Sequence, residues 1–259
     1  MKRFMHNVKF PVTKPHSLQQ DEAYFILCEN GGEREIHFHD YAEIYNHKGL
    51  YEQLFYDRLK CISPAMVCDI LRNVLMQNHV EMSELRVLDV GAGNGMVGEQ
   101  LIKLGIARVI GVDILSEACS ACERDRPGAY DAFYVVDLEN MDDSSIADFQ
   151  AWRIDCMTTV AALGFQDIPP IAFSRAYNLV KTGGWIAFNI KETFLQVSDT
   201  SGFSTLVKDM LMTDILEIHH LERYRHRISI DGRPLYYYAL VGKKERNIPL
   251  DDFEKYSNP

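Results

Sequence analysis

The sequence predicts an α/β fold in which a doubly wound, mostly parallel sheet ends in an antiparallel hairpin. Short aliphatic segments alternate with segments whose apolar residues recur at helical spacing, a pattern typical of parallel strands covered by helices on both faces. The strands expected in this sheet are 86–90, 108–113, 133–137, 154–159 and 185–190. Two further strand-like segments, 216–230 and 235–241, flank the turn signal Asp231-Gly232. Strands joined by so short a turn must be antiparallel.

The elements before this sheet form an N-terminal extension. Apolar residues at 23–28 and 36–38 flank a turn at Asn30-Gly31-Gly32, which predicts a hairpin. Residues 40–60 favour a helix interrupted near Gly49, and Ser63-Pro64 supplies a helix N-cap and a first-turn proline. Further helices are expected at 96–104, 115–125, 170–181 and 203–212. We therefore divide the chain into an extension, 1–62, and a main domain, 63–259.

Composition narrows the class of protein. The 259 residues are 47% hydrophobic, enough to bury a substantial core. A formal net charge of −10 disfavours binding to nucleic acid or to an anionic membrane surface. The 6 cysteines form no disulfide framework, and the sequence shows neither a signal peptide nor an apolar stretch of membrane-spanning length. We expect a cytoplasmic setting with free thiols.

A glycine run follows the first strand of the main sheet. Gly91, Gly93 and Gly95 alternate after the apolar segment 87–90, and a helical pattern begins directly afterwards. A loop without Cβ atoms, next to a helix N-terminus, lets the backbone approach a nucleotide-like ligand closely. The run predicts a cofactor that contains adenosine.

Two cofactor classes compete for this loop. Residues 93–98 spell G-x-G-x-x-G, and Asp113 lies about 20 residues on, where a dinucleotide fold places its ribose-binding acid. A nicotinamide-dependent oxidoreductase is therefore an alternative. One observation opposes this alternative: Gly91, and not Gly93, lies where the strand ends. Gly98 then falls inside the helix as a packing residue. Asp89 would repel a pyrophosphate and favour a cofactor that carries an ammonium and a sulfonium.

The run VLDVGAGNG at 87–95, with VIGVD at 109–113, resembles motif I and its successor in the class I S-adenosylmethionine-dependent methyltransferases. The resemblance extends from about residue 40 to residue 244. It implies a Rossmann-like, seven-stranded sheet whose last strand is antiparallel, and S-adenosyl-L-methionine as the cofactor. Within the family, HDYAEIY (39–45) and RDRPGAY (124–130) are similar to the small methyltransferase-like proteins of the Williams–Beuren-region type.

The resemblance also implies roles for residues at the carboxyl ends of the strands, where ligands bind in open α/β sheets. The glycine loop would contact the methionine and ribose portions of the cofactor, and Asp89 would help to hold the amino acid end through water or backbone. Asp113 would accept hydrogen bonds from both ribose hydroxyls. Ile114 would press on the face of the adenine ring. Asp137 would accept a hydrogen bond from the adenine amino group, with Leu138 beside it. Thr159 and Val160 would lie near the reactive methyl group. The cofactor-binding candidates are Asp89, Gly91, Ala92, Gly93, Asn94, Gly95, Asp113, Ile114, Asp137, Leu138, Thr159 and Val160.

Each of the two later acids also has a purely structural explanation. Asp113 could cap the helix that follows it, and Asp137 could be a turn residue. Their occurrence at successive strand ends, after the glycine run, favours the binding site.

The acceptor side is less defined. Tyr41 and Tyr45, at helical spacing in the extension, and Glu192, just after the fifth strand, are the candidates there. Cys119-x-x-Cys122 lies in an expected helix without a second pair, so we expect no metal site.

The expected reaction is an in-line displacement at the sulfonium methyl, accelerated by alignment and exclusion of water. We expect a small-molecule acceptor, with a protein side chain as the second choice and nucleic acid disfavoured. A catalytically silent cofactor-binding regulator is the third interpretation.

Overall fold

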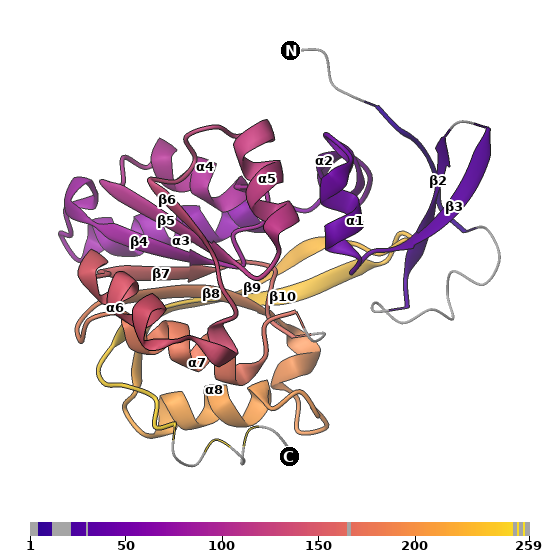
Figure 1. The fold of residues 1–259 in the computed structure, drawn as a ribbon. Coiled ribbons are helices and arrows are strands. Elements are labelled where there is room, and N and C mark those ends of the chain that lie inside the picture. The colour runs from indigo at the N-terminus through magenta and orange to yellow at the C-terminus, as the bar shows by residue number, and fades with distance from the viewer. Residues whose placement is uncertain are drawn as a thin grey trace.

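The computed structural model describes residues 5–11, 22–29, 31–164, 167–250, 253 and 256. A seven-stranded sheet with the order β6-β5-β4-β7-β8-β10-β9 forms its centre, and a three-stranded sheet with the order β1-β2-β3 lies to one side (Figure 1). The first five strands of the central sheet run parallel, whereas β10 pairs antiparallel with both β8 and β9. The predicted fold class, a mostly parallel sheet ending in an antiparallel hairpin, is confirmed.

The central strands are β4 (Arg86–Val90), β5 (Arg108–Asp113), β6 (Ala132–Val135), β7 (Cys156–Thr159), β8 (Trp185–Lys191), β9 (Leu216–Ile228) and β10 (Pro234–Lys244). The helices of the main domain are α3 (Ser63–Gln77), α4 (Met96–Lys103), α5 (Ser116–Asp125), α6 (Asp143–Trp152), α7 (Pro170–Leu179) and α8 (Phe203–Met212). Short helical turns follow or precede strands at η3 (Met82–Glu84), η4 (Leu138–Asn140) and η5 (Glu192–Leu195).

Both faces of the central sheet are buried. Side chains alternate along each strand, so Val87 and Leu88 of β4 enter different cores. Val87 packs with α3 and α4, whereas Leu88 packs with α7 and α8 (Figure 1). This two-sided burial explains why the parallel strands are almost continuously apolar.

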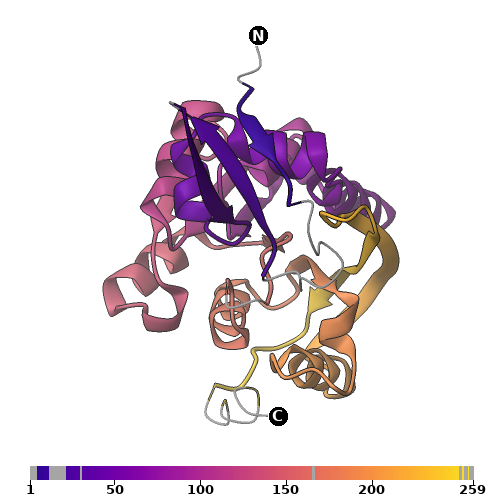
Figure 2. The same cartoon turned by 90° about the vertical axis from the view of Figure 1, so that its right-hand side faces the viewer.

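The described residues of the extension fold as a small sheet and three helical segments. Its elements are β1 (Asn7–Lys9), β2 (Tyr24–Glu29), β3 (Gly32–His37), α1 (Tyr41–Asn46), α2 (Leu50–Glu52) and the π-helical turn η2 (Gln53–Arg58). Phe25 and Phe38 lie in the core of this part, and Ile228 and Ile230, at the tip of the β9–β10 hairpin, pack against it. Figure 2 shows the small sheet in front of the main domain.

Several local predictions need correction. β6 ends at Val135, so Asp137 lies beyond the strand, and β7 begins only at Cys156. α6 and β1 were not predicted: α6 buries only Phe149, which leaves little helical periodicity to detect. Among the described residues, no helix has both the length and the apolar character needed to cross a bilayer.

The start of α3 also differs from the prediction. Ile62 occupies the N-cap position, and Ser63 is the first helical residue. The Ser63 hydroxyl lies 2.6 Å from both the Tyr224 hydroxyl and Nδ1 of His226, on β9. These buried partners engage the side chain that would otherwise have capped the helix.

Candidate functional site

A cavity of about 320 Å³ lies at the carboxyl ends of β4, β5, β6 and β7. Its walls come from the glycine loop, from the residues that follow these strands and from aromatic residues of the extension. Its size falls within the range of roughly 300–1,000 Å³ that is usual for small-molecule sites. The predicted site residues that line it are Tyr41, Tyr45, Gly91, Ala92, Gly93, Asn94, Asp113, Ile114, Asp137, Leu138 and Val160.

The glycine loop needs glycine because other groups approach it closely. Gly91 and Gly93 have φ angles of 71° and 52°, in the left-handed region. A Cβ on Gly91 would lie 2.8 Å from the Cβ of Ala162, and one on Gly93 would lie 2.5 Å from the Tyr45 hydroxyl. The extension thus rests directly on the loop.

Asp113 lines the cavity beside the glycine loop. One carboxylate oxygen accepts a hydrogen bond from the Gly93 amide at 2.9 Å, and the other accepts from the Leu115 amide at 3.0 Å. Burial raises the pKa of Asp113, and these two amide bonds oppose the rise. Leu115, not Asp113, is the N-cap of α5. Each carboxylate oxygen has a second lone pair, so the group can still accept hydrogen bonds from a diol.

Asp137 combines a turn role with a place in the cavity wall. Its oxygens accept hydrogen bonds from the Glu139 amide and from Nδ2 of Asn140, both at 2.8 Å. These bonds, with that of Asn140 foremost, lower the pKa of Asp137. Leu138 beside it is buried, whereas Ile114 is 60% exposed and presents an apolar surface to the cavity.

Four predicted residues lie outside the cavity wall. Gly95 packs against α5, since a Cβ there would lie 2.8 Å from Sγ of Cys122. Thr159, in β7, is fully buried. Glu192 turns toward β9, where its carboxylate accepts from Nε of Arg223 at 2.8 Å.

Asp89 is the fourth, and its carboxylate is engaged by two neighbouring side chains. It is 1% exposed and accepts hydrogen bonds from the Tyr130 hydroxyl at 2.6 Å and from Oγ1 of Thr158 at 2.8 Å. Burial raises the pKa of Asp89 to about 7. The Tyr130 hydroxyl also lies 3.3 Å from the Ala92 carbonyl, so the pair supports the loop from beneath.

A histidine–aspartate pair in the cavity wall was not predicted. Nδ1 of His39 lies 3.1 Å from a carboxylate oxygen of Asp167. Burial raises the pKa of Asp167, and the contact with His39 opposes the rise. The two residues are 128 positions apart, so no local pattern could have indicated their pairing.

The part of the cavity wall that the extension forms is rich in tyrosine. Tyr41 and Tyr45 stack with ring centres 6.1 Å apart, and Tyr51 lies 5.2 Å from Tyr45. Tyr56 also lines the cavity. Burial raises the pKa of all four phenols above the ordinary value, so they are neutral near pH 7.

A buried polar network holds the wall after β7. The Ala161 amide, at a residue with a φ of 58°, donates to Oδ1 of Asn189 at 2.6 Å. Nδ2 of Asn189 donates to the Tyr224 hydroxyl at 2.6 Å and to Oγ of Ser63 at 3.1 Å. These bonds fix the unusual backbone that follows the strand.

The dinucleotide interpretation of residues 93–98 is not supported by the end of β4, because Gly91, and not Gly93, follows the strand directly. Gly98 lies inside α4, and a Cβ there would lie 2.7 Å from the Tyr130 ring. This confirms Gly98 as a packing residue.

Comparisons with known proteins agree with this geometry. Residues 88–188 match the family model described as a methyltransferase domain. A ubiquinone biosynthesis O-methyltransferase from Burkholderia vietnamiensis is 29% identical over 114 residues, covering 44% of this chain and 47% of the relative. One from Nitrosococcus oceani is 28% identical over 142 residues, covering 54% and 58%. The chain thus spans about half the length of these curated relatives.

Solved structures share the fold. The N-methyltransferase NodS from Bradyrhizobium japonicum, in complex with S-adenosyl-L-homocysteine, matches with a TM-score of 0.56 at 11% identity and covers 81% of this chain and 98% of NodS. A TehB-like SAM-dependent methyltransferase from Corynebacterium glutamicum matches with a TM-score of 0.50 at 17% identity, covering 79% and 98%. The chain therefore has the Rossmann-like fold of these solved methyltransferases, and its residues 88–188 match a methyltransferase domain.

Proposed function

We propose that this protein transfers a methyl group from S-adenosyl-L-methionine to a hydroxyl group of a small aromatic acceptor. The observation that carries the proposal is one cavity that joins the glycine loop and Asp113 to the His39–Asp167 pair and the tyrosines of the extension. The curated relatives are named for O-methylation in ubiquinone biosynthesis, which supports a hydroxyl acceptor.

The residues at the strand ends fit the cofactor. Bare backbone at Gly91 and Gly93 admits a ligand without a Cβ in the way, and Asp113 suits two ribose hydroxyls. Ile114 offers an apolar face to an adenine ring, and Asp137 lies within reach of its edge. When bound, the cofactor would supply an electrophilic methyl group for the acceptor oxygen.

The residues of the acceptor side align the acceptor and remove its proton. Asp167 holds Nδ1 of His39, so the hydroxyl proton passes to Nε2 as the oxygen attacks. The neutral phenols of Tyr41 and Tyr45 exclude water and present aromatic faces that favour a developing positive charge. This role depends on the extension, and we propose that 1–62 covers the site of a main domain at 63–259.

Turnover with a panel of acceptors tests the proposal. The purified chain is incubated with S-adenosyl-L-methionine and phenolic, amine, thiol and peptide acceptors, and methylated products are identified by mass spectrometry. We expect methylation of a phenolic hydroxyl. Product only from amines, thiols or peptides would refute the hydroxyl acceptor, and peptide methylation would favour the second choice, a protein side chain.

The absence of any product would favour a catalytically silent regulator. Calorimetry that detects a nicotinamide dinucleotide but not S-adenosyl-L-methionine would favour the oxidoreductase.

A matched pair of variants tests the base. His39→Gln should lower kcat about 10²–10⁴-fold, the usual contribution of a general base, with the cofactor affinity unchanged. His37→Gln is the control, because His37 is exposed on β3 and pairs only loosely with Glu35 at 3.7 Å. Equal activity of the two variants would remove His39 from the mechanism.

We also propose the narrower relationship to the small methyltransferase-like proteins of the Williams–Beuren-region type. The two segments that suggested it, 39–45 and 124–130, meet in the structure, where the Arg124 guanidinium donates to the Tyr45 carbonyl at 3.0 Å.

A further inference from the structure

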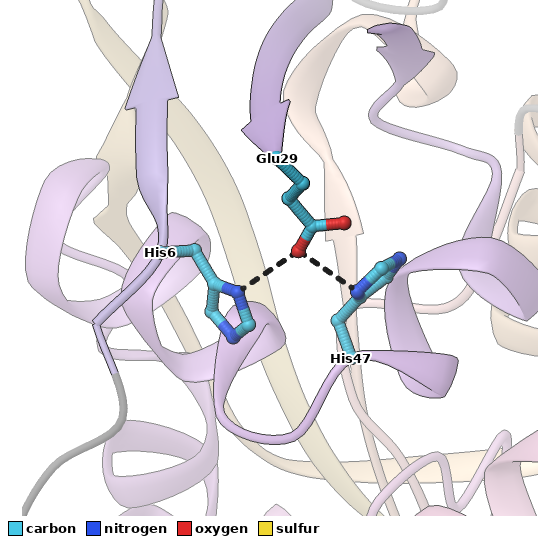
Figure 3. Close-up of side chains that lie close together, drawn as sticks. All are labelled: His6, Glu29 and His47. Carbon is cyan, nitrogen blue, oxygen red and sulfur yellow. Dashed lines mark ion pairs between the residues drawn. The ribbon is translucent and has the colours of Figure 1, made fainter. Parts of the chain in front are cut away.

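We propose that His6, Glu29 and His47 form a zinc-binding site in the N-terminal extension, separate from the methyl-transfer cavity. Figure 3 shows the three side chains converging from three elements. His6 precedes β1, Glu29 is the last residue of β2, and His47 follows directly after α1. None of the three lines the cavity.

The spacing of the three ligand atoms suits a shared cation. Nδ1 of His6 lies 3.6 Å and Nδ1 of His47 lies 3.5 Å from the same oxygen of Glu29. All three ligand atoms lie within 4.8 Å of one another. These separations are too long for hydrogen bonds. Around a tetrahedral zinc ion with bonds of about 2.0–2.2 Å, ligand atoms are separated by roughly 3.4 Å, close to the two distances found here.

The far nitrogen of each imidazole is occupied in the manner of a metal-bound histidine. Nε2 of His6 lies 2.9 Å from the Lys48 carbonyl, and Nε2 of His47 lies 3.1 Å from a carboxylate oxygen of Glu43. Both partners only accept, so each Nε2 carries the hydrogen and each Nδ1 presents a lone pair. Carbonyl or carboxylate partners of this kind orient the histidine ligands in metal sites.

A nearby arginine does not change this assignment. The Arg34 guanidinium lies 3.2 Å from Nε2 of His47 but also donates to the same Glu43 oxygen. An arginine can only donate, and the Glu43 carboxylate has lone pairs for both donors. With both donors on Glu43, the hydrogen of His47 is on Nε2 and Nδ1 faces Glu29.

The fold holds His6 in position, and the acceptor atoms of His6, Glu29 and His47 face one another. The His6 amide donates to Oε1 of Gln53, and Nε2 of Gln53 donates back to the His6 carbonyl, both at 2.8 Å. His6 is thereby held in place by a side chain that is 4% exposed. Two lone pairs and a carboxylate directed at one point form an arrangement that can bind a cation. Two imidazoles and one carboxylate are ligands suited to Zn²⁺, with water at the fourth position.

Zinc titration of the full chain tests the site. The protein, expressed without a histidine tag and stripped with a chelator, is titrated at pH 7.5 with Zn²⁺ in competition with a chromophoric chelator. We expect one zinc ion per chain, and X-ray absorption with nitrogen and oxygen neighbours at about 2.0 Å. Sulfur neighbours would assign the metal to the free cysteines and overturn the proposal. A chain that binds no zinc would also overturn the proposal.

Variants locate the ion. His6→Gln, Glu29→Gln and His47→Gln should each weaken zinc binding at least tenfold, since the loss even of an outer partner costs about 10–100-fold. Glu43→Ala, which removes no ligand, should weaken it by that 10–100-fold. His37→Gln is again the control and should bind as the wild type does.

Thermal melting without metal identifies any variant that fails to fold, and Glu43→Ala then carries the test. Zinc affinity that is unchanged in His47→Gln, or equally lost in His37→Gln, would refute the assignment. These readouts do not involve methyl transfer, so the zinc site and the proposed activity can fail independently.

Discussion

Replacement of Asp113 gives the sharpest test of the cofactor site. In Asp113→Ala the ribose hydroxyls would lose a charged acceptor, an interaction of about 1.5–3 kcal/mol. At about 1.4 kcal/mol per tenfold change, Kd for S-adenosyl-L-methionine should rise roughly 10- to 150-fold. Isothermal titration calorimetry measures this change directly.

The structure predicts a second, separable effect of the same substitution. The Gly93 and Leu115 amides would lose their acceptor, and an unsatisfied buried donor costs about 1–3 kcal/mol of folding free energy. Asp113→Asn keeps one acceptor oxygen and should melt between the wild type and Asp113→Ala.

Glu192→Gln is the matched control, because its carboxylate follows β8 but pairs with Arg223 outside the cavity. It should bind the cofactor normally. A folded Asp113→Ala variant that binds within twofold of the wild type would refute the ribose assignment.

Three further predictions concern stability. Gly93→Ala should lower the free energy of unfolding by about 1–3 kcal/mol, because its Cβ would meet the Tyr45 hydroxyl. Adding Tyr45→Phe should recover part of this loss. Strictly additive effects in a double-mutant cycle would contradict the contact. The pKa of Asp89 is raised from 3.8 to about 7, so its contribution to stability is complete below pH 3.8 and is lost as the pH rises through 7. Denaturant unfolding at several pH values should show this loss in the wild type and not in Asp89→Asn; identical pH profiles would refute it. Lys244→Met should destabilise the chain by about 1–3 kcal/mol in thermal and urea melts. The reason is that the Lys244 ammonium donates to the Tyr177 and Val180 carbonyls at the end of α7. An unchanged melting temperature would show that these acceptors find other donors.

The features that could be predicted from the sequence are those with a short repeat. Apolar runs predict the parallel strands. The glycine run, directly after such a strand, predicts that Gly91 lies at the strand end. The Asp231-Gly232 turn likewise predicts the antiparallel hairpin. Each of these depends on residues within one element and its adjoining turn, where local spacing determines the geometry.

Predictions failed where a distant partner decides the outcome. Ser63 carries an N-cap signature but bonds Tyr224 and His226, which lie more than a hundred positions away in the sequence. The buried partners of Asp89, Tyr130 and Thr158, likewise lie far from it in the sequence, and no local pattern indicates them.

The amino-acid order by itself determined the strand–glycine loop–helix unit, the acid at the end of the second strand and the direction of the final hairpin, because hydrogen bonding and side-chain alternation repeat over two to four residues. Only the tertiary structure decided which groups share a cavity wall with that unit, among them the tyrosines of the extension and the His39–Asp167 pair. The same holds for His6, Glu29 and His47, which are dispersed over more than forty positions and meet only because a hairpin and a helix end pack together. Contacts between residues so far apart in the sequence depend on how buried surfaces pack together. That packing leaves no repeating pattern in a single sequence.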